Sequence, residues 1–339
     1  MATPLADYAV HLRADDNVAV ARKPIPAATT FAFDAGSFTL PKGIGMGHKF
    51  ALVPIKEGDP IRKYGQVIGF AGRAIAPGEH VHVHNVKLGA FERDYAHATQ
   101  TPAPLPPPAE WRTFMGFDRG PSRPDHQRYG TRNYLAVIST VNCSASTSKY
   151  IADRVRALGL LKDYPNVDGV IAIVHRQGCG MQFDGPDHQQ LDRTLAGFAR
   201  HPNVAAYLLV GLGCEIVQAS HLIENEKLNL LQLDGSKGAP LALSIQECGG
   251  IGKTVEAGVK AVAEMLPRVN DVRRVQLPAK HLILGTNCGG SDGNSGVTAN
   301  PALGVASDLM VQQGGTSVLG ETTEIYGAEH ILTRRAVSK

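Results

Sequence analysis

A proline-rich segment about one third of the way along the chain constrains the fold most strongly. Residues 101–110 contain five prolines in ten positions. Proline lacks a backbone N–H and fixes φ, so such a segment forms neither a helix nor an inner strand. It is typical of an extended, semi-rigid linker. We therefore predict a linker over residues 99–112, with one domain at 1–98 and a second at 113–339.

The region before the linker reads as a series of short strands. We expect them at residues 10–12, 18–21, 49–55, 67–70 and 80–86, where apolar residues cluster or alternate. Turn signals such as Pro77-Gly78-Glu79 separate them, and no segment has a helical period. The pattern predicts a small all-β domain.

After the linker, strand and helix patterns alternate. Strands are expected at 134–140, 170–174, 207–210, 228–233, 241–245 and 281–284, and helices at 146–161, 190–199, 253–265 and 301–313. This alternation implies a mostly parallel sheet with right-handed crossovers. We predict a Rossmann-like α/β domain that extends to the end of the chain.

Charge and hydropathy exclude several classes of protein. The net charge is +3 and no block of like charges occurs, which gives no support for a nucleic-acid partner. No run of 18 apolar residues is present, so we expect no membrane span. The N-terminus lacks the pattern of a signal peptide. We therefore expect a cytoplasmic protein whose five cysteines are thiols or metal ligands rather than disulfides.

The five cysteines all follow predicted strands. Cys143, Cys179, Cys214, Cys248 and Cys288 are separated by intervals of 36, 35, 34 and 40 residues. In an open α/β sheet, ligands bind beyond the carboxyl ends of the strands, on loops held by a rigid scaffold. The spacing therefore indicates a functional site at this edge.

The residues around the cysteines favour a metal. They include imidazole and carboxylate groups, in the sequences His175–Gly180, Gly211–Glu215 and Asn287–Gly293. Thiolate, imidazole and carboxylate together suit iron or zinc. The alternative is that each free cysteine is a small buried hydrophobic residue. Cys248 has no nearby histidine, and the absence of a CxxC pair argues against a closed structural zinc site.

Two further groups could carry chemistry. In a strand, His80, His82 and His84 would share one face, where they could reach a metal or a substrate proton; an exposed polar strand face is the alternative. Arg132 could hold a substrate carboxylate, although an arginine at a strand start is more often a surface residue. The glycine-rich loop at 289–296 matches no nucleotide-binding fingerprint.

Several motifs together resemble the altronate/galactarate dehydratase family. They are HVHVHN at 80–85, GTRNY at 130–134, STVNC at 139–143, HRQGCG at 175–180, GLGCE at 211–215, CGGSDGNSGVTANPAL at 288–303 and EIYGAE at 324–329. They occur in the family's order and span nearly the whole chain. The N-terminal part resembles the family's SAF-type (β-clip) domain.

The resemblance implies a hydro-lyase that dehydrates a sugar acid, such as altronate or galactarate, to a 2-keto-3-deoxy acid. It also implies Fe²⁺, Mn²⁺ or another divalent metal, with an iron–sulfur cluster as the alternative. We expect a homodimer as the default assembly. The candidate residues are His82, His84, His175 and Asp292 for acid–base catalysis, Arg132, Asn133 and Ser291 for substrate binding, and Cys143, Cys179, Cys214, Glu215 and Cys288 for the metal.

Two departures from the family pattern affect these expectations. Asp125-His126-Gln127-Arg128 replaces a tighter Asp-Gly-Arg turn. Family members also continue past a segment like 325–339, so we expect a fragment or a shortened member. The alternative function is then a non-catalytic module that binds sugar acids.

Overall fold

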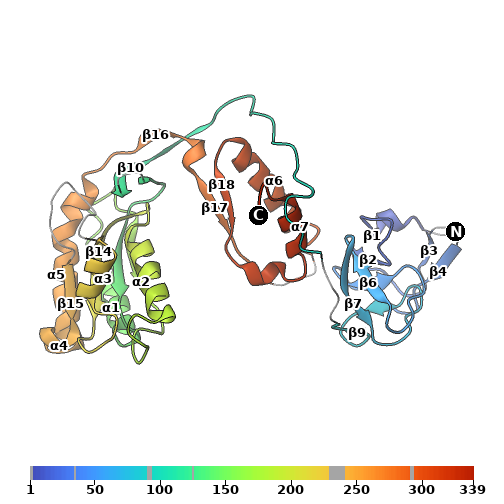
Figure 1. The fold of residues 1–339 in the computed structure, drawn as a ribbon, viewed down its shortest axis with the longest axis horizontal. Helices are drawn as coiled ribbons and strands as arrows, with labels where there is room; N and C mark the ends of the chain where they lie inside the picture. The colour runs from blue at the N-terminus through green and yellow to red at the C-terminus, as the bar shows by residue number, and fades with distance from the viewer. Residues whose placement is uncertain (1–2, 34–35, 90–93, 124–125, 229–240, 291–293) are drawn as a thin grey trace. The chain divides into compact units, whose positions relative to one another are not determined.

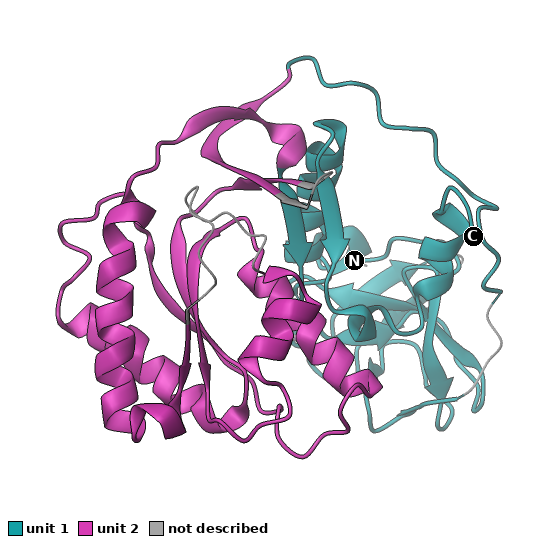
Figure 2. Cartoon of the chain, turned by 60° about the vertical axis from the view of Figure 1, so that its left-hand side comes forward, with its two compact units in different colours: residues 1–110, 282–339 teal, residues 111–281 magenta. Residues whose placement is uncertain are grey.

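The chain folds into two units in the computed structural model, which describes residues 3–33, 36–89, 94–123, 126–228, 241–290 and 294–339. Unit 1 comprises Met1–Glu110 and Leu282–Lys339, and unit 2 comprises Trp111–His281 (Figure 2). The sequence predicts one α/β domain over 113–339. Here the segment from Leu282 onward groups with the N-terminal region instead, because its strands form a sheet of their own.

Short antiparallel strands make up the described part of unit 1 before residue 90. They are β1 (Ala9–Val10), β2 (Val18–Ala21), β3 (Thr30–Phe33), β4 (Gly36–Thr39), β5 (Lys49–Ala51), β6 (Pro60–Lys63), β7 (Gln66–Ala71), β8 (His80–Val81) and β9 (Val86–Lys87) (Figure 1). They pair in the orders β1-β2-β5-β8, β3-β4 and β6-β7-β9. The described residues here hold one 3-10 turn, Leu5–Asp7, and no α-helix. The predicted all-β region is confirmed.

Two small apolar clusters hold this region together. One contains Phe31 and Phe50, whose stacked rings lie 6.0 Å apart, and the other contains Ile61 and Val81. All four side chains are fully buried. Burying one such side chain contributes about 1.5–3 kcal/mol, so short strands become stable by sharing these clusters.

The proline-rich segment is extended, as predicted. Residues 101–108 form neither helix nor strand. Hydrogen bonds join this segment to the C-terminal part of unit 1, from Thr101 Oγ1 to the Ala336 carbonyl at 2.8 Å and from Gln312 Nε2 to the Pro106 carbonyl at 3.0 Å. The linker therefore lies along a surface of its own unit.

A four-stranded parallel sheet forms the centre of unit 2. Its order is β13-β12-β14-β15, with β12 at Tyr134–Ser139, β13 at Gly169–Ile173, β14 at Val204–Gly211 and β15 at Leu241–Ser244. β14 is buried along its whole length because helices cover both faces of the sheet. The predicted parallel sheet is confirmed. Most of the strand expected at 228–233 lies outside the described residues.

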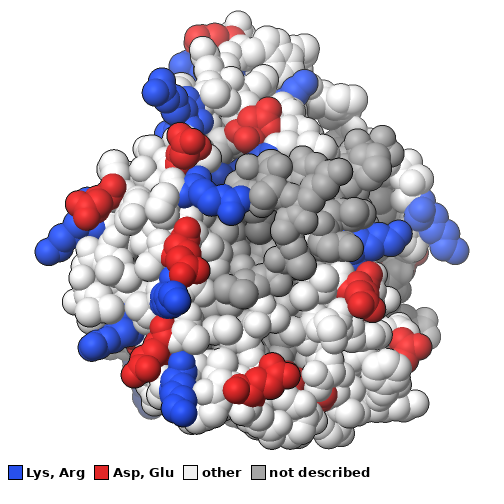
Figure 3. Space-filling model, turned by 90° about the vertical axis from the view of Figure 1, so that its left-hand side faces the viewer, with Lys and Arg blue, Asp and Glu red and all other residues white. Residues whose placement is uncertain are grey.

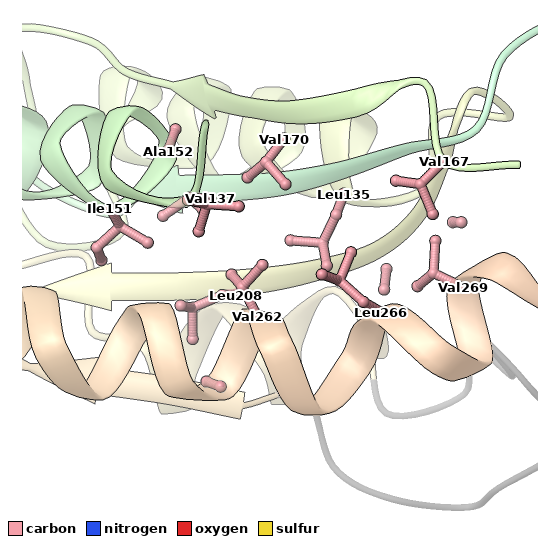
Figure 4. Close-up of a cluster of buried hydrophobic side chains, with 14 of the residues drawn as sticks. Leu135, Val137, Ile151, Ala152, Val167, Val170, Leu208, Val262, Leu266 and Val269 are labelled. Carbon is pink, nitrogen blue, oxygen red and sulfur yellow. The ribbon is translucent and has the colours of Figure 1, made fainter. Parts of the chain in front are cut away.

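Helices pack on each face of this sheet. Their bounds are α1 (Ala145–Ala157), α2 (Pro186–Ala199), α3 (Ala219–Asn225), α4 (Ile245–Cys248) and α5 (Ile251–Asn270). α1 and α5 cover one face, where Ile151 and Val262 point toward Leu135 and Leu208 (Figure 4). α2 and α3 cover the other face. Gly258 lets α5 approach α1, because a Cβ there would overlap Ile151.

A second, antiparallel sheet in unit 2 was not predicted. It pairs β10 (Thr113–Arg123) with β11 (His126–Gly130) and β16 (Val275–Pro278). Gly116, Gly120 and Pro121 interrupt the apolar pattern of β10, which explains why a strand was not predicted there.

The segment after His281 forms a small parallel pair. β17 (Ile283–Thr286) and β18 (Thr316–Leu319) are joined by α6 (Ala299–Gln312), and α7 (Glu329–Arg335) follows. The strand predicted at 281–284 and the helix predicted at 301–313 are confirmed, with shifts of one or two residues at the ends.

Charges are mixed on the surface drawn in Figure 3. Lysine and arginine side chains alternate with aspartate and glutamate on that face of the described residues, without a large area of one sign. In the described part of the chain, no helix has both the length and the apolar character needed to cross a membrane.

Candidate functional site

Four cysteines lie at the carboxyl edge of the parallel sheet in unit 2. Cys143 lies in the 3-10 turn after β12, Cys179 in the loop after β13, Cys214 in the loop after β14, and Cys248 at the end of α4 after β15. The predicted strand-end positions are confirmed. Cys143, Cys179 and Cys214 are exposed, so the alternative that they are buried hydrophobic residues is wrong for these three.

The strand order places two of these loops at a topological switch point. β12 is followed in the chain by β13 on one side, and β14 lies on its other side. The chain connections leave β12 and β14 in opposite directions, and α/β proteins commonly bind ligands beyond the carboxyl ends of two such strands. Cys143 lies after β12 and Cys214 after β14.

Hydrogen bonds join the loops at this edge. Asn142 N–H donates to the Gln177 carbonyl at 2.8 Å, and Ile216 N–H donates to the Gly178 carbonyl at 3.2 Å. The loops after β12, β13 and β14 therefore form one continuous surface, and the side chains on it are held at fixed positions.

Glu215, a predicted metal ligand, is buried beneath this surface. Its Oε1 accepts hydrogen bonds from Thr140 Oγ1 at 2.9 Å and Leu212 N–H at 3.2 Å, and its Oε2 accepts one from Gly213 N–H at 2.6 Å. A Cβ on Gly211 would overlap this carboxylate, so glycine at this position leaves room for it. Both carboxylate oxygens are used in holding the loops together, and metal binding by Glu215 stays a prediction.

His175, a predicted acid–base residue, lies half-buried in the loop after β13. Its Nε2 lies 3.0 Å from the Ser139 carbonyl, and its Nδ1 accepts the Gln177 N–H at 3.1 Å. These partners are consistent with a neutral ring protonated on Nε2. Burial lowers its pKa, with the Ser139 hydrogen bond acting in the opposite direction. A neutral imidazole can accept a proton, as a catalytic base must. The acid–base role of His175 remains a prediction.

Arg132 and Asn133 lie at the other end of β12, before its first residue. Arg132 forms an exposed ion pair with Asp168 at 3.2 Å. Asn133 is fully buried, and its Nδ2 donates to the Asn166 and Val269 carbonyls at 2.7 and 2.9 Å. The structure does not bring these two residues to the strand-end loops. Their predicted substrate binding is therefore not supported by their position.

The strand predicted over 80–86 is interrupted at residues 82–85, between β8 and β9. β8 ends at Val81, because the Asn85 side chain closes a turn by accepting from His82 N–H at 2.9 Å and donating to the His80 carbonyl at 2.9 Å. The imidazoles nevertheless gather: the His80 ring lies 5.4 Å from His82 and 5.5 Å from His84.

A fourth histidine, absent from the sequence prediction, joins this cluster. His48 Nδ1 lies 2.9 Å from His80 Nε2, and the His48 and His82 rings stack at 5.8 Å. Burial lowers the pKa of His80, and the nearby histidines act in the same direction. His48 is distant in sequence and follows no motif, so only strand pairing between β5 and β8 brings it here.

Cys288 lies in unit 1, after β17, with its N–H donating to Glu321 Oε2 at 2.9 Å. A cavity of about 1060 Å³ in this unit is lined by residues that include Lys49, Lys63, Asn287, Cys288 and Glu321. Burial lowers the pKa of both lysines. Ser291 and Asp292, the other predicted site residues in this loop, lie outside the described residues.

The structure brings together a different group of potential metal ligands. In the described residues of unit 2, Cys143, Cys179, Cys214 and Glu215 do not form a group of three ligand atoms within 4.8 Å, whereas His188, Asp192 and His221 do. A possible metal site therefore exists on the α2–α3 layer. The i,i+4 spacing of His188 and Asp192 was the one sequence signal for it.

Three family profiles match successive parts of the chain. They are the altronate/galactarate dehydratase SAF domain at residues 7–89, the D-galactarate dehydratase/altronate hydrolase second domain at 120–270, and the D-galactarate/altronate dehydratase C-terminal region at 279–339. Their order follows that of the structural regions described above.

Curated relatives match along nearly the whole chain. An altronate dehydratase of Bacillus subtilis is 35% identical over 97% of this chain, and one of Escherichia coli is 34% identical over 95%. The galactarate dehydratase (L-threo-forming) of Escherichia coli is 36% identical over 99%. The chain spans 62–63% of the length of these relatives.

Proposed function

The chain belongs to the altronate/galactarate dehydratase family, and from that premise we propose that it takes part in the dehydration of a sugar acid to a 2-keto-3-deoxy acid. The observation that carries this proposal is that the family profiles match in order over most of the sequence. The chain spans less than two thirds of the length of these relatives. The dehydratase activity of the full-length relatives is therefore a proposal for this chain.

The reaction is a β-elimination next to a carboxylate. A base removes the C2 proton, the C3 hydroxyl leaves as water after protonation by an acid, and the resulting enol tautomerises to the 2-keto acid. The hard step is the first one, because charge develops on the carboxylate as the proton leaves. The substrate class is therefore a polyhydroxylated carboxylate with hydroxyl groups at C2 and C3.

The fold supports a site at the carboxyl edge of the parallel sheet. A sheet of order β13-β12-β14-β15 with helices on both faces is what a Rossmann-like domain requires, and its switch point is the expected place for a ligand. We propose that exposed Cys143, Cys179 and Cys214 face substrate or metal there. We propose His175 as the catalytic base at this edge of the sheet.

We propose His82 and His84 as acid–base residues of unit 1. Both imidazoles are exposed on the closed turn, and they contact a cluster in which the pKa of His80 is lowered. Asp292, Ser291 and Arg132 remain proposals that rest on the family motifs. A divalent cation such as Fe²⁺ or Mn²⁺, when bound, would stabilise the charge on the substrate carboxylate and 2-hydroxyl.

The described thiols do not fit a preformed metal cluster. They follow neighbouring strands but do not converge with Glu215, whose oxygens already accept three hydrogen bonds. Thiolate ligation and the iron–sulfur alternative are separated by anaerobic purification with analysis of iron and acid-labile sulfide. Sulfide in proportion to iron would support the cluster, and iron without sulfide would support a mononuclear site.

A panel of aldonates and aldarates tests the function. The full chain is incubated anaerobically with each sugar acid and Fe²⁺ or Mn²⁺, and formation of a 2-keto acid is measured. Product from at least one substrate supports the dehydratase. Thermal stabilisation by a sugar acid without product would instead support a non-catalytic module that binds sugar acids, the alternative function.

We also propose a homodimer, because two-fold assemblies are the commonest among oligomeric enzymes. Light scattering on the full chain measures the mass directly. A monomeric mass at the concentration used for activity would contradict this part of the proposal.

A further inference from the structure

Three side chains on two neighbouring helices of unit 2 come together and have no role in the proposed reaction. His188 and Asp192 lie one turn apart on α2, and His221 lies in the first turn of α3. One ligand atom from each residue lies within 4.8 Å of the other two. These positions follow from helix geometry, since residues i and i+4 share a face and α3 packs beside α2 on the same side of the sheet.

The polar atoms of this group are buried without adequate partners. His188 and Asp192 are each 1% exposed. His188 Nε2 and both Asp192 carboxylate oxygens lack a hydrogen bond of normal geometry. Burial raises the pKa of Asp192, while the two nearby histidines and the Asn225 side chain act in the opposite direction. His221 Nε2 lies 3.6 Å from Asp192 Oδ2, which is too long for a hydrogen bond. A buried carboxylate in this state is costly unless a cation accompanies it.

The neighbours of these three side chains are apolar and aromatic. The Phe183 ring lies 5.1 Å from the His188 ring and 5.2 Å from the His221 ring, and the two imidazoles are 5.3 Å apart. Leu191 and Leu222 belong to the apolar cluster on this face. Phe183 and His221 are partly exposed, so a cation can reach the group from solvent, whereas the buried Leu191 and Leu222 lower the local polarity and strengthen the attraction between a bound cation and the carboxylate.

We propose that His188, Asp192 and His221 bind one divalent transition-metal cation. Two imidazoles and one carboxylate form the donor set that proteins use for Zn²⁺ and for Fe²⁺ or Mn²⁺. With bonds of about 2.0–2.2 Å, tetrahedral ligand atoms are roughly 3.3–3.6 Å apart. The 3.6 Å separation of His221 Nε2 and Asp192 Oδ2 already meets this requirement.

Coordination by His188 has a consequence for the neighbouring loop. The Asp184 N–H donates to His188 Nδ1 at 3.2 Å, so the ring proton of the neutral imidazole lies on Nε2. Binding a metal through Nε2 moves that proton to Nδ1, and the Asp184 amide must then turn away. Asp184 has φ of 56°, a left-handed conformation that is unfavourable for a residue other than glycine. The backbone at Asp184 should therefore change when the metal binds.

Calorimetric titration of the full chain with Zn²⁺, after chelator treatment, tests the site. We expect one Zn²⁺ bound at this site in the wild type. Asp192→Asn keeps the shape of the side chain but removes its charge, and should weaken binding on the order of 10–100-fold or more. His221→Gln changes a partly exposed residue and should do the same without a large effect on folding. Wild-type affinity in both variants would overturn the proposal.

The exposed histidine cluster of unit 1 provides the control, because imidazoles there could also bind Zn²⁺. His48→Gln removes one of its rings and should leave the site on α2 and α3 unchanged. If His48→Gln abolishes the bound Zn²⁺ and His221→Gln does not, the metal belongs to the other cluster and the inference is wrong.

Thermal unfolding gives a second readout that does not depend on turnover. Zn²⁺ should raise the melting temperature of the wild type and have little effect on Asp192→Asn or His221→Gln. If Asp192→Asn instead raises the melting temperature of the metal-free protein and Zn²⁺ changes nothing in the wild type, the three side chains form a proton-occupied polar cluster. Neither measurement uses keto-acid formation, so failure of the proposed dehydratase activity would not affect this result.

Discussion

Thr140 Oγ1 donates a 2.9 Å hydrogen bond to Glu215 Oε1 inside unit 2, and this bond joins the loop after β12 to the loop after β14. The two strands flank the switch point of the parallel sheet. A buried contact thus fixes the distance between the exposed loops that carry Cys143 and Cys214. The strength of this contact should control both folding and the geometry of the candidate site.

Removing the Thr140 hydroxyl tests that connection. Thr140→Val keeps the shape of the side chain but takes one donor away from a buried carboxylate, and we expect the free energy of unfolding to fall by about 1–3 kcal/mol. Denaturant midpoints measure the change. Thr194→Val, on the exposed face of α2, is the matched control and should cost no more than about 0.5 kcal/mol. Equal effects at the two positions would contradict the anchoring role of Thr140.

His175 should contribute to the dependence of stability on pH. Burial lowers its pKa in the folded chain, whereas the unfolded ring has an ordinary pKa of about 6.5. The unfolded state therefore binds more protons as pH falls through that value, so this contribution to stability is present above it and is lost below it. The free energy of unfolding should decrease less in His175→Gln than in the wild type between about pH 7.5 and pH 5.5.

The comparison between variant and wild type matters because burial also lowers the pKa of His201. The His175→Gln variant should therefore retain the part of the pH dependence that comes from His201 and other histidines. His97→Gln, at an exposed position in unit 1, is the control and should match the wild type. A His175→Gln variant with an unchanged pH dependence would show that the ring is not held neutral by burial.

Neighbouring residues Arg132 and Asn133 should respond very differently to substitution. Asn133→Ala removes a buried amide whose Nδ2 bonds two carbonyls and whose Oδ1 accepts from Arg119, and we expect a loss of about 2–4 kcal/mol. Arg132→Ala breaks an exposed ion pair and should cost less than about 1 kcal/mol. Thermal or denaturant unfolding measures both. An increase in KM in Arg132→Ala without a change in stability would support its predicted substrate binding.

Asn85 should control the arrangement of the histidine cluster. Asn85→Ala removes both side-chain hydrogen bonds that close the turn after β8, so we expect a loss of about 1–2 kcal/mol and wider separation of the His80 and His82 rings. Histidine NMR resonances and the melting temperature report these two effects. If His82 and His84 act on the substrate, Asn85→Ala should lower kcat more than it raises KM. Unchanged histidine resonances would show that the turn keeps its shape without this side chain.

Sequence periodicity correctly predicted the elements whose patterns are long and regular. The strand β14 and the helix α5 belong to this group. β14 is buried on both faces and so reads as a continuous apolar run, whereas α5 is buried along one side and shows apolar residues at the helical period. β10 was missed, since its glycines and proline hide the strand. The strand predicted over 80–86 is interrupted at residues 82–85, because the side-chain hydrogen bonds of Asn85 favour a turn there.

The sequence by itself determined the all-β region, the extended linker, the alternating α/β region and the strand-end positions of the cysteines. Each of these features depends on residues that are close together in the sequence, so the local pattern is sufficient to predict it. Only the tertiary structure decided that Thr140 holds Glu215, that His48 joins His80, and that His188, Asp192 and His221 meet. These contacts join residues far apart in sequence, and strand order and helix packing select them through burial and hydrogen bonding that no local pattern records.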